Sequence, residues 1–392
     1  CTNPPYMGRG GMNAKLKKIL DSQFKIANKD LFATFIKMNS KYAKVRGFIS
    51  MITMESWMFL SSYEALRLEI IDNTIIYSLI HMPYDGKGRT SLGINFGTCA
   101  FVLRKNRNVD YSGKYCYIRF FEIDDTGVPV NFPVRNERFG TSKMSAFGRI
   151  PGNPIVYWIS DNVYSAFLTG KMLLNVADIK QGLKTGDNDK FMRIWYEVTK
   201  EKTSIFGGFK WYPCNKGGDY RKWYGNNNYV LNWENDGYEL KNFRHSDGRQ
   251  KSRPQNLKYM FREGLTYTNI SSSKFGVRYC SDGFAFDAAG SMIFTSKERL
   301  YYLLGLLSSK IISVFTSILS PTMSFEVGQI SLIPYIEHIN PNIDTLVAEN
   351  INISRKDWDS FETSWDFKKH PLLTHKNEAD KIEGAFNNWS DF

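Results

Sequence analysis

In the first third of the chain, segments with apolar residues at helical spacing alternate with short continuous apolar runs. Apolar positions recur at helical spacing over residues 31–38, with lysine and asparagine between them, and a second short helix is predicted over residues 63–70. Continuous apolar runs, which are typical of buried strands, lie between and after these segments at 45–53, 74–81, 97–103 and 115–121. Alternating helices and buried strands predict an α/β sheet within residues 1–122.

The pattern changes after residue 122. Proline and glycine become frequent over residues 123–175, which predicts a connector. Short aromatic strands then alternate with Gly, Asn and Asp turns over residues 176–341, as in a mixed, mainly β (α+β) domain. The apolar run at 301–319 contains Lys310 and small or hydroxyl side chains, so we expect one buried helix there and no membrane span. Residues 342–392 are polar and acidic and are predicted to be a linker.

Charge is distributed unevenly along the 392 residues. The net charge is +12, yet residues 342–392 carry six basic and ten acidic side chains, a charge of −4, which leaves +16 on the remainder. A basic body favours a polyanionic partner. An aromatic content of 15% argues against disorder. The five cysteines are far apart without a Cys-x-x-Cys pair, and the five histidines lack metal-ligand spacing, so a reduced, cytoplasmic, metal-free protein is expected.

The opening tetrapeptide Asn3-Pro4-Pro5-Tyr6 has a composition suited to methylation of an amine or amide nitrogen. The lone pair of an exocyclic amine is conjugated into its ring, so the nitrogen is a poor nucleophile. The Asn3 side-chain oxygen and the Pro4 carbonyl are two acceptors for its two hydrogens, and they would localise the lone pair for in-line attack. The two prolines stiffen the loop, and Tyr6 offers a face on which a base can stack. This motif usually ends a strand.

The second domain has the composition of a DNA-reading surface. Residues 241–262 contain seven basic side chains against one acidic one, and residues 209–223 interleave aromatic and basic residues. Amide side chains in the same stretches can pair with base edges. The side chains predicted to contact DNA are Lys184, Asn188, Lys190, Lys210, Lys216, Arg221, Lys222, Lys241, Arg244, Arg249, Lys251 and Arg253.

Longer blocks give the chain a family resemblance. They are TNPPYMGRGGMN and GINFGTCAFVLRK in the first domain, and then KTGDNDKFMRIWYEV, LKYMFREGLTYTNI, KFGVRYCSDGFAFD and KDWDSFETSWDFKKHPLL. Together they resemble the PglX family of adenine-specific DNA methyltransferases, which act in bacterial BREX phage-defence systems. The blocks extend over almost the whole chain and are more specific than the tetrapeptide, which many amine and amide methyltransferases share.

The resemblance implies a fold and a set of roles. Residues 1–122 would be the second half of a Rossmann-like class I methyltransferase sheet, and residues 176–341 a target-recognition domain with residues 184–191 among its signature positions. Asn3, Pro4 and Tyr6 would hold an adenine flipped out of the duplex, Pro5 would shape the loop, and Phe96 would form a second aromatic wall. The implied partners are double-stranded DNA, other BREX proteins and phage-encoded inhibitors.

The same resemblance implies S-adenosylmethionine as methyl donor. The family's donor pocket uses a Gly-rich strand-to-helix turn and an acidic residue upstream of the motif, and this sequence shows neither. We therefore expect the isolated chain to bind the donor poorly and to turn over little. Two other functions fit the residues: an amide or amine methyltransferase acting on RNA or on protein glutamine, and a DNA-binding specificity module without catalysis.

Overall fold

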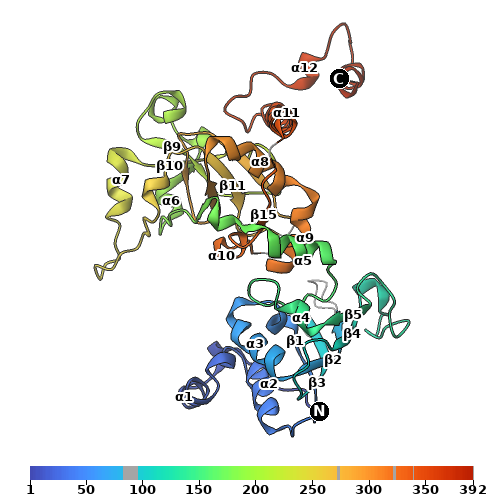
Figure 1. Cartoon of the computed structure of the whole chain (residues 1–392). Coiled ribbons are helices and arrows are strands. Elements are labelled where there is room, and N and C mark those ends of the chain that lie inside the picture. The colour runs from blue at the N-terminus through green and yellow to red at the C-terminus, as the bar shows by residue number, and fades with distance from the viewer. Residues whose placement is uncertain (83–95, 272–273, 321–323, 339, 392) are drawn as a thin grey trace. The chain divides into compact units, whose positions relative to one another are not determined.

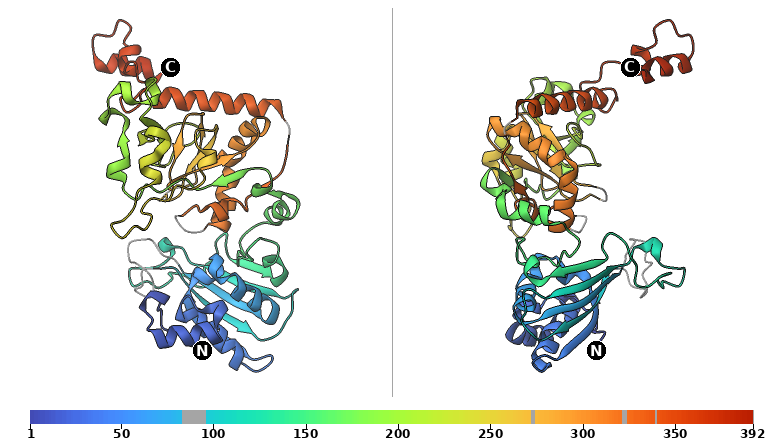
Figure 2. Two further views of the ribbon diagram at one scale, coloured as in Figure 1. Left: turned by 90° about the vertical axis from the view of Figure 1, so that its left-hand side faces the viewer. Right: turned by 45° about the vertical axis from the view of Figure 1, so that its right-hand side comes forward.

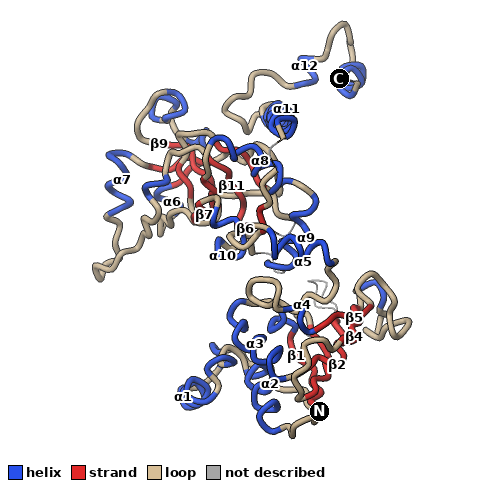
Figure 3. Tube along the Cα trace, viewed as in Figure 1, coloured by secondary structure: helices blue, strands red, loops and turns tan. Residues whose placement is uncertain are grey.

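The computed structural model describes residues 1–82, 96–271, 274–320, 324–338 and 340–391. The chain divides into two units, Cys1–Gly170 and Lys171–Phe392. Figure 1 shows the course of the chain, and Figure 3 shows its secondary structure. Each unit has its own hydrophobic core and is described by itself.

Unit 1 is a mixed sheet with helices packed against it. Its elements are α1 (Ala14–Gln23), α2 (Leu31–Tyr42), β1 (Phe48–Met54), α3 (Glu64–Asn73), β2 (Ile75–Met82), β3 (Thr98–Arg104), β4 (Ser112–Tyr117), β5 (Gly140–Lys143), α4 (Met144–Phe147) and α5 (Asp161–Thr169). The strand order is β1-β3-β2-β4-β5. Strand β3 is antiparallel to both β1 and β2, β2 is parallel to β4, and β5 is antiparallel to β4.

One face of this sheet is covered by α2 and α3 (Figure 2). In β1 the buried side chains alternate, Ile49, Met51 and Thr53, and each lies opposite a buried residue of β3. The alternation arises because successive side chains of a strand point to opposite faces. Phe32 and Ile36 of α2 are fully buried against this face. The predicted α/β sheet is thus present as a mixed sheet.

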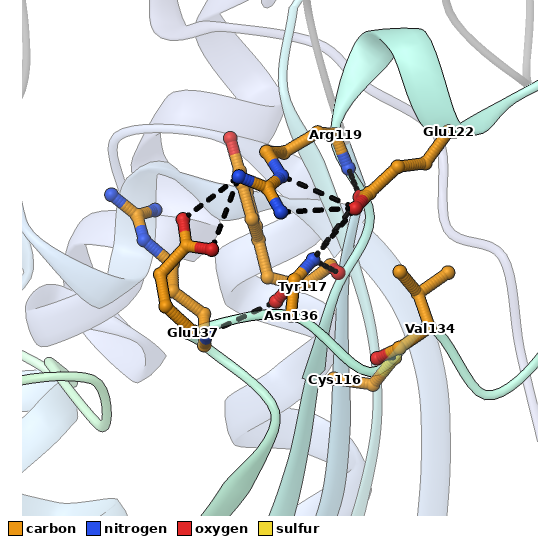
Figure 4. A network of polar contacts seen from close by, with 8 residues as sticks. Cys116, Tyr117, Arg119, Glu122, Val134, Asn136 and Glu137 are labelled. Carbon is orange, nitrogen blue, oxygen red and sulfur yellow. Dashed lines mark hydrogen bonds and ion pairs between the residues drawn. The ribbon is translucent and has the colours of Figure 1, made fainter.

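The opposite face carries a smaller cluster, formed by Cys116, Ile118 and Val134. The segment that follows β4 folds over it and is fixed by polar contacts (Figure 4). Asn136 Nδ2 donates to the Tyr117 carbonyl at 2.8 Å and to Glu122 Oε2 at 3.0 Å. Strand β4 ends at Tyr117, whose carbonyl accepts from Asn136, and this is earlier than the predicted strand over 115–121. Residues Phe120–Glu122 form a 3-10 turn instead.

Unit 2 contains two four-stranded sheets, one with the order β13-β9-β10-β8 and one with the order β12-β11-β14-β7. Its strands are β6 (Lys171–Met172), β7 (Asp178–Lys180), β8 (Met192–Ile194), β9 (Trp211–Asn215), β10 (Tyr229–Asn232), β11 (Gly264–Thr268), β12 (Val277–Cys280), β13 (Ala285–Phe286), β14 (Gly290–Phe294) and β15 (Pro334–Tyr335). Its helices are α6 (Asn188–Phe191), α7 (Glu234–Lys241), α8 (Lys297–Ser308), α9 (Lys310–Leu319), α10 (Val327–Ile330), α11 (Pro341–Trp358), α12 (Pro371–Thr374) and α13 (Ile382–Ser390).

The apolar run at 301–319 differs from the single helix expected. It is divided between α8 and α9, which are bent by 77° at Ser309, a residue in extended conformation. Among the described residues, no single helix is long and apolar enough to cross a membrane, and only this bent pair reaches the required length and composition together.

The acidic region from residue 342 is also more ordered than the linker expected. It begins with α11, an 18-residue helix with Asn340 as its N-cap and Pro341 in its first turn. Val347 of α11 packs close to Gly305 of α8, where an added Cβ would lie 3.1 Å from a Val347 methyl group. Beyond the helix, Trp365 packs against Phe284 of the unit 2 core. The apolar side chains within this acidic sequence account for the packing.

Candidate functional site

The Asn3–Tyr6 loop is fixed to the sheet on both sides. Before it, the Thr2 N–H donates to the Ser50 carbonyl at 2.9 Å, and Thr2 accepts from the Ile52 N–H at 3.2 Å, so Thr2 pairs in parallel with the outer edge of β1. The loop therefore leaves the sheet near the carboxyl end of β1. In α/β sheets this is the edge at which ligands bind.

After the loop, Asp30 holds the chain in place. Its Oδ1 accepts from the Met7 N–H at 3.1 Å and from the Phe32 N–H at 3.3 Å, so the same carboxylate caps α2 and anchors the end of the loop. Burial raises the pKa of Asp30, while these backbone hydrogen bonds act in the opposite direction. The loop thus has a fixed entry and a fixed exit.

Within the loop, Tyr6 connects the predicted groups. Its hydroxyl donates to Asn3 Oδ1 at 2.9 Å and to the Ile52 carbonyl at 3.3 Å. Its ring meets that of Phe96 edge-to-face, with centroids 5.2 Å apart at 76°. Partial burial raises the pKa of the Tyr6 phenol, and Cys99 adds to the shift, so the hydroxyl stays protonated at neutral pH and remains a donor. Asn3 is exposed, whereas Pro4 is buried. The structure therefore brings an exposed carboxamide and two aromatic rings together.

A row of side chains runs across the sheet beside this loop. The register places Thr53 of β1 opposite Cys99 of β3, Cys99 opposite His81 of β2, and His81 opposite Tyr117 of β4. Residues paired in this way lie on the same face. The Cys99 thiol is buried, and burial raises its pKa to about 12, so it is an inert part of the core. The row ends at Tyr117.

Glu55 joins this row to the aromatic wall. Its carboxylate contacts His81 Nε2, while Tyr157 Oη and His81 Nδ1 lie 3.3 Å apart. The Glu55 N–H donates to the Gly97 carbonyl at 3.0 Å, and a Cβ on Gly97 would lie 2.2 Å from Glu55 Oε1. A larger residue at position 97 would therefore displace the Glu55 carboxylate from this position. Since Gly97 follows Phe96, these contacts set the position of the second ring.

The cationic side chains predicted on unit 2 fall into two sets. Lys184 and Arg253 are exposed and joined by a backbone bridge, with N–H···O distances of 3.0 and 2.7 Å. Arg244 lies on the nearby turn that Gln250 closes, and Asn188 and Lys216 line a recess of about 380 Å³. Arg244 Nη1 donates to the Gly248 carbonyl at 3.2 Å, and Lys216 Nζ lies 4.6 Å from the centroid of the Tyr229 ring. Within the described ranges, no carboxylate forms an ion pair with Lys184, Lys216, Arg244 or Arg253. We call these four the open cations.

Of the other predicted cations, six form ion pairs with carboxylates of unit 2, and the seventh, Lys222, is engaged by a backbone carbonyl. Lys222 donates to the Ser308 carbonyl at 2.6 Å, and burial lowers its pKa. The ion pairs are Lys190–Glu239, Lys210–Glu234, Arg221–Asp357, Lys241–Asp236, Arg249–Asp247 and Lys251–Asp187. The Arg221 guanidinium also lies over the Trp358 ring at 5.1 Å, so it fastens α11 to the unit. Arg221 and Lys222 therefore have structural roles in this unit.

Three groups near the Asn3–Tyr6 loop do not follow from the sequence motif: Glu55, His81 and Tyr117. A sequence signal for them exists, because Glu55 directly follows β1, His81 lies near the end of β2, and Tyr117 ends β4. Polar residues at the carboxyl ends of such strands tend to lie at the ligand-binding edge.

The described residues can be searched for groups that could hold a metal ion or a donor phosphate. They contain no group of three or more His, Cys, Asp or Glu side chains placed to hold a metal ion. The Gly8–Gly11 run is not a phosphate-type turn, because Arg9–Gly11 forms a 3-10 turn and the Arg9 guanidinium pairs with Asp21 at 2.6 Å. Residues Gly8–Gly11 thus do not fit a nucleoside donor.

Comparison with known proteins places this geometry in context. Residues 1–87 match the family model of the Eco57I restriction-modification methylase. The chain is 36% identical to the adenine-specific methyltransferase BrxX of Escherichia coli O9:H4 (strain HS), covering 99% of this chain and 32% of that protein. It is also 36% identical to the adenine-specific methyltransferase PglX of Lacticaseibacillus casei (strain Zhang), covering 99% of this chain and 34% of the relative. The expected PglX-type resemblance is confirmed.

The chain spans about a third of the length of these curated relatives. Among solved structures, the type IIL restriction-modification enzyme MmeI in complex with DNA aligns with all of this chain and 53% of its own, with a TM-score of 0.54 and 12% identity. At that identity the likeness is one of fold.

Proposed function

We propose that this chain forms the part of a site-specific DNA N6-adenine methyltransferase that holds the target adenine and reads the DNA, within a BREX-type phage-defence system. The observation that carries the proposal is the exposed Asn3 oxygen, held by Tyr6 beside a second ring from Phe96. Two relatives named adenine-specific methyltransferases support it. Unit 2, which combines two four-stranded sheets with helices and carries the open cations, is the proposed target-recognition domain.

The strand order of unit 1 supports its proposed role as half of a class I methyltransferase sheet. The third strand in sequence, β3, lies between the first two and is antiparallel to both. Thr2 extends the sheet in parallel beyond β1, at the point where a preceding strand would deliver the Asn3–Tyr6 loop. The reacting groups are then at the carboxyl edge of the parallel strands.

In the proposed mechanism the adenine leaves the duplex and enters the space beside Tyr6, because its amine is not accessible within the base stack. Asn3 Oδ1 and the Pro4 carbonyl accept the two amine hydrogens, which directs the nitrogen lone pair outward. Before the base arrives, the Tyr6 hydroxyl orients the Asn3 oxygen at 2.9 Å. The Tyr6 ring stacks on the purine, and the Phe96 ring forms a second aromatic wall of the space that holds it. S-adenosylmethionine, when bound elsewhere in the complete protein, supplies the methyl group.

Two experiments test this proposal. Modification-sensitive sequencing of host DNA, with and without the gene for the complete protein, should show N6-methyladenine at one sequence only when the gene is present. A binding comparison of duplex DNA, RNA and a glutamine-containing protein over a salt series should favour DNA and weaken steeply as salt rises. Unmarked host DNA with preferential RNA or protein binding would support the amide or amine alternatives. DNA binding without marking would support the specificity module.

The isolated chain is expected to bind S-adenosylmethionine more weakly than about 100 µM in isothermal titration. The reason is that its Gly8–Gly11 run forms a 3-10 turn at Arg9–Gly11, with the Arg9 side chain paired to Asp21, and not a donor-binding turn between a strand and a helix. The complete protein, titrated in the same buffer, is the control. Micromolar affinity of the isolated chain would contradict this prediction and place the donor pocket within these residues.

Alanine substitutions should separate the open cations from the paired ones. Arg253→Ala is expected to weaken binding of all duplexes and to reduce the slope of log K against log salt by about one, as for one lost phosphate contact. Arg221→Ala should leave that slope unchanged, because its guanidinium is engaged with Asp357 and Trp358, and should instead lower thermal stability. Equal slopes for Arg253→Ala and the unsubstituted protein would remove Arg253 from the interface.

A further inference from the structure

Arg138 lies at the end of the segment that follows β4 and is partly exposed. Its guanidinium carbon is 4.4 Å from the centroid of the Tyr117 ring and 4.4 Å from that of Trp158. A guanidinium that lies over aromatic rings keeps its charge and is held flat, while the N–H groups at its edge stay available. The two aromatic rings therefore orient the Arg138 guanidinium, and its N–H groups are not needed to hold it in place.

The carboxylates around Arg138 are engaged elsewhere. Glu122 and Glu137 both pair with Arg119, at 3.1 and 3.0 Å (Figure 4). Glu55, further along the same sheet edge, contacts His81. In the portion of the chain that the structure describes, no carboxylate forms an ion pair with Arg138. The positive charge remains available for an external anion.

The backbone at Arg138 is fixed to the sheet. The Arg138 N–H donates to Asn136 Oδ1 at 3.0 Å, and Asn136 in turn donates to the carbonyl of Tyr117, the last residue of β4. The backbone of Arg138 and one of its two flanking rings, that of Tyr117, are thus positioned by the same strand end. A group held in this way loses little conformational entropy when it binds a ligand.

This strand end belongs to the candidate site. Tyr117 lies opposite His81, and their rings are 5.2 Å apart. His81 contacts Glu55, and the Glu55 N–H donates to the Gly97 carbonyl next to Phe96. Arg138 and the Asn3–Tyr6 loop therefore lie along one edge of one sheet, in one unit. A base held by Tyr6 brings its own sugar-phosphate backbone to this edge.

We propose that Arg138 binds a backbone phosphate of the DNA strand that carries the target adenine. The inference rests on the proposed function. A phosphate accepts two parallel N–H donors from a guanidinium edge, and lysine cannot reproduce that planar fork. The contact would hold the strand while its base occupies the space beside Tyr6, so Arg138 is a DNA-binding residue at the methylation site.

The test uses the complete protein and duplexes in which single phosphates around the target are replaced by uncharged methylphosphonates. With the unsubstituted protein, replacement at one position near the adenine should weaken binding about ten-fold. Arg138→Gln should bind the unmodified duplex about ten-fold more weakly. A methylphosphonate at that one position should not weaken its binding further, whereas methylphosphonates at the other positions should weaken it as they do for the unsubstituted protein. Arg138→Lys should recover only part of the affinity.

Arg135→Gln is the matched control, since Arg135 lies in the same segment, is exposed and approaches a single ring, that of Phe139 at 5.8 Å. It should leave the methylphosphonate profile unchanged. If the unsubstituted protein methylates DNA and Arg138→Gln has the same methylphosphonate profile as the unsubstituted protein, the phosphate contact of Arg138 is overturned and the proposed function stands. Absence of DNA methylation by the unsubstituted protein would overturn the proposed function and this inference with it.

Discussion

Asn3→Ala in the complete protein is expected to lower the methylation rate about 10²–10³-fold, as when one preorganised hydrogen-bonding group is removed from a reaction centre. The side-chain oxygen of Asn3 is one of the two acceptors proposed for the amine hydrogens, and alanine leaves only the Pro4 carbonyl. Single-turnover methylation of a duplex with one target site measures the effect. Duplex affinity should hardly change, because the open cations on unit 2 are untouched.

Asn13→Ala provides the matched control for this result. Asn13 is an exposed asparagine near the same loop, and its Oδ1 accepts from the Leu16 N–H at 2.9 Å as the N-cap of α1. Its loss should destabilise α1 by about 1 kcal/mol and leave the methylation rate unchanged. Methylation at the unsubstituted rate by Asn3→Ala would refute the role given to the carboxamide. A large loss of duplex binding would show instead that Asn3 acts before chemistry.

The sequence predicts the strands of unit 1 because their apolar runs are bounded by polar residues. It also identifies the Asn3–Tyr6 loop, since that chemistry resides in four adjacent residues. The sheet order is not readable from the pattern, because β3 pairs with β1 at a distance of about fifty residues, as Thr53 and Cys99 show. For the same reason the contact of Glu55 with His81 and Gly97 depends on register and could not be predicted.

The predicted DNA contacts show a second limit of sequence reasoning. A run of basic residues gives the net charge but not the partner of each side chain. Arg221 and Lys222 belong to a basic, aromatic stretch, yet Asp357 and the Ser308 carbonyl, distant in sequence, engage them. Arg253 lies in an equally basic stretch and remains open. The difference arises from tertiary packing of α8 and α11, which composition does not encode.

The apolar run at 301–319 shows how one residue alters an element. Its helical periodicity is continuous, but Ser309 adopts an extended conformation between α8 and α9. Serine readily leaves a helix at such a position, because it favours helix N-caps over helix interiors. Composition predicts the two buried helical halves, whereas the bend of 77° between them is not readable from it.

Arg67→Met is expected to destabilise unit 1 by about 3–5 kcal/mol, the usual cost of breaking a buried, charged hydrogen-bond network. Arg67 is 1% exposed. Its Nη1 donates to the carbonyls of Trp57 at 2.9 Å and Leu60 at 2.7 Å, and its Nε and Nη2 donate to the carbonyl of Gly152 at 3.0 and 2.6 Å. Burial lowers the pKa of Arg67 to about 10, so the group is still charged at neutral pH. Methionine fills a similar volume but leaves three carbonyls without their donor.

Thermal unfolding of the isolated chain measures this prediction, and the transition of unit 1 should fall by about 10 °C. The transition of unit 2 should stay in place, because its core is separate. Arg107→Met, at an exposed arginine of the same unit, should shift neither transition. The effect also extends to the site, since Glu55 and Trp57 belong to the same 3-10 turn, Glu55–Met58, and Trp57 Nε1 donates to the Cys99 thiol at 3.3 Å. An unchanged unit 1 transition would show that the carbonyls find other donors and that Arg67 does not fasten this turn.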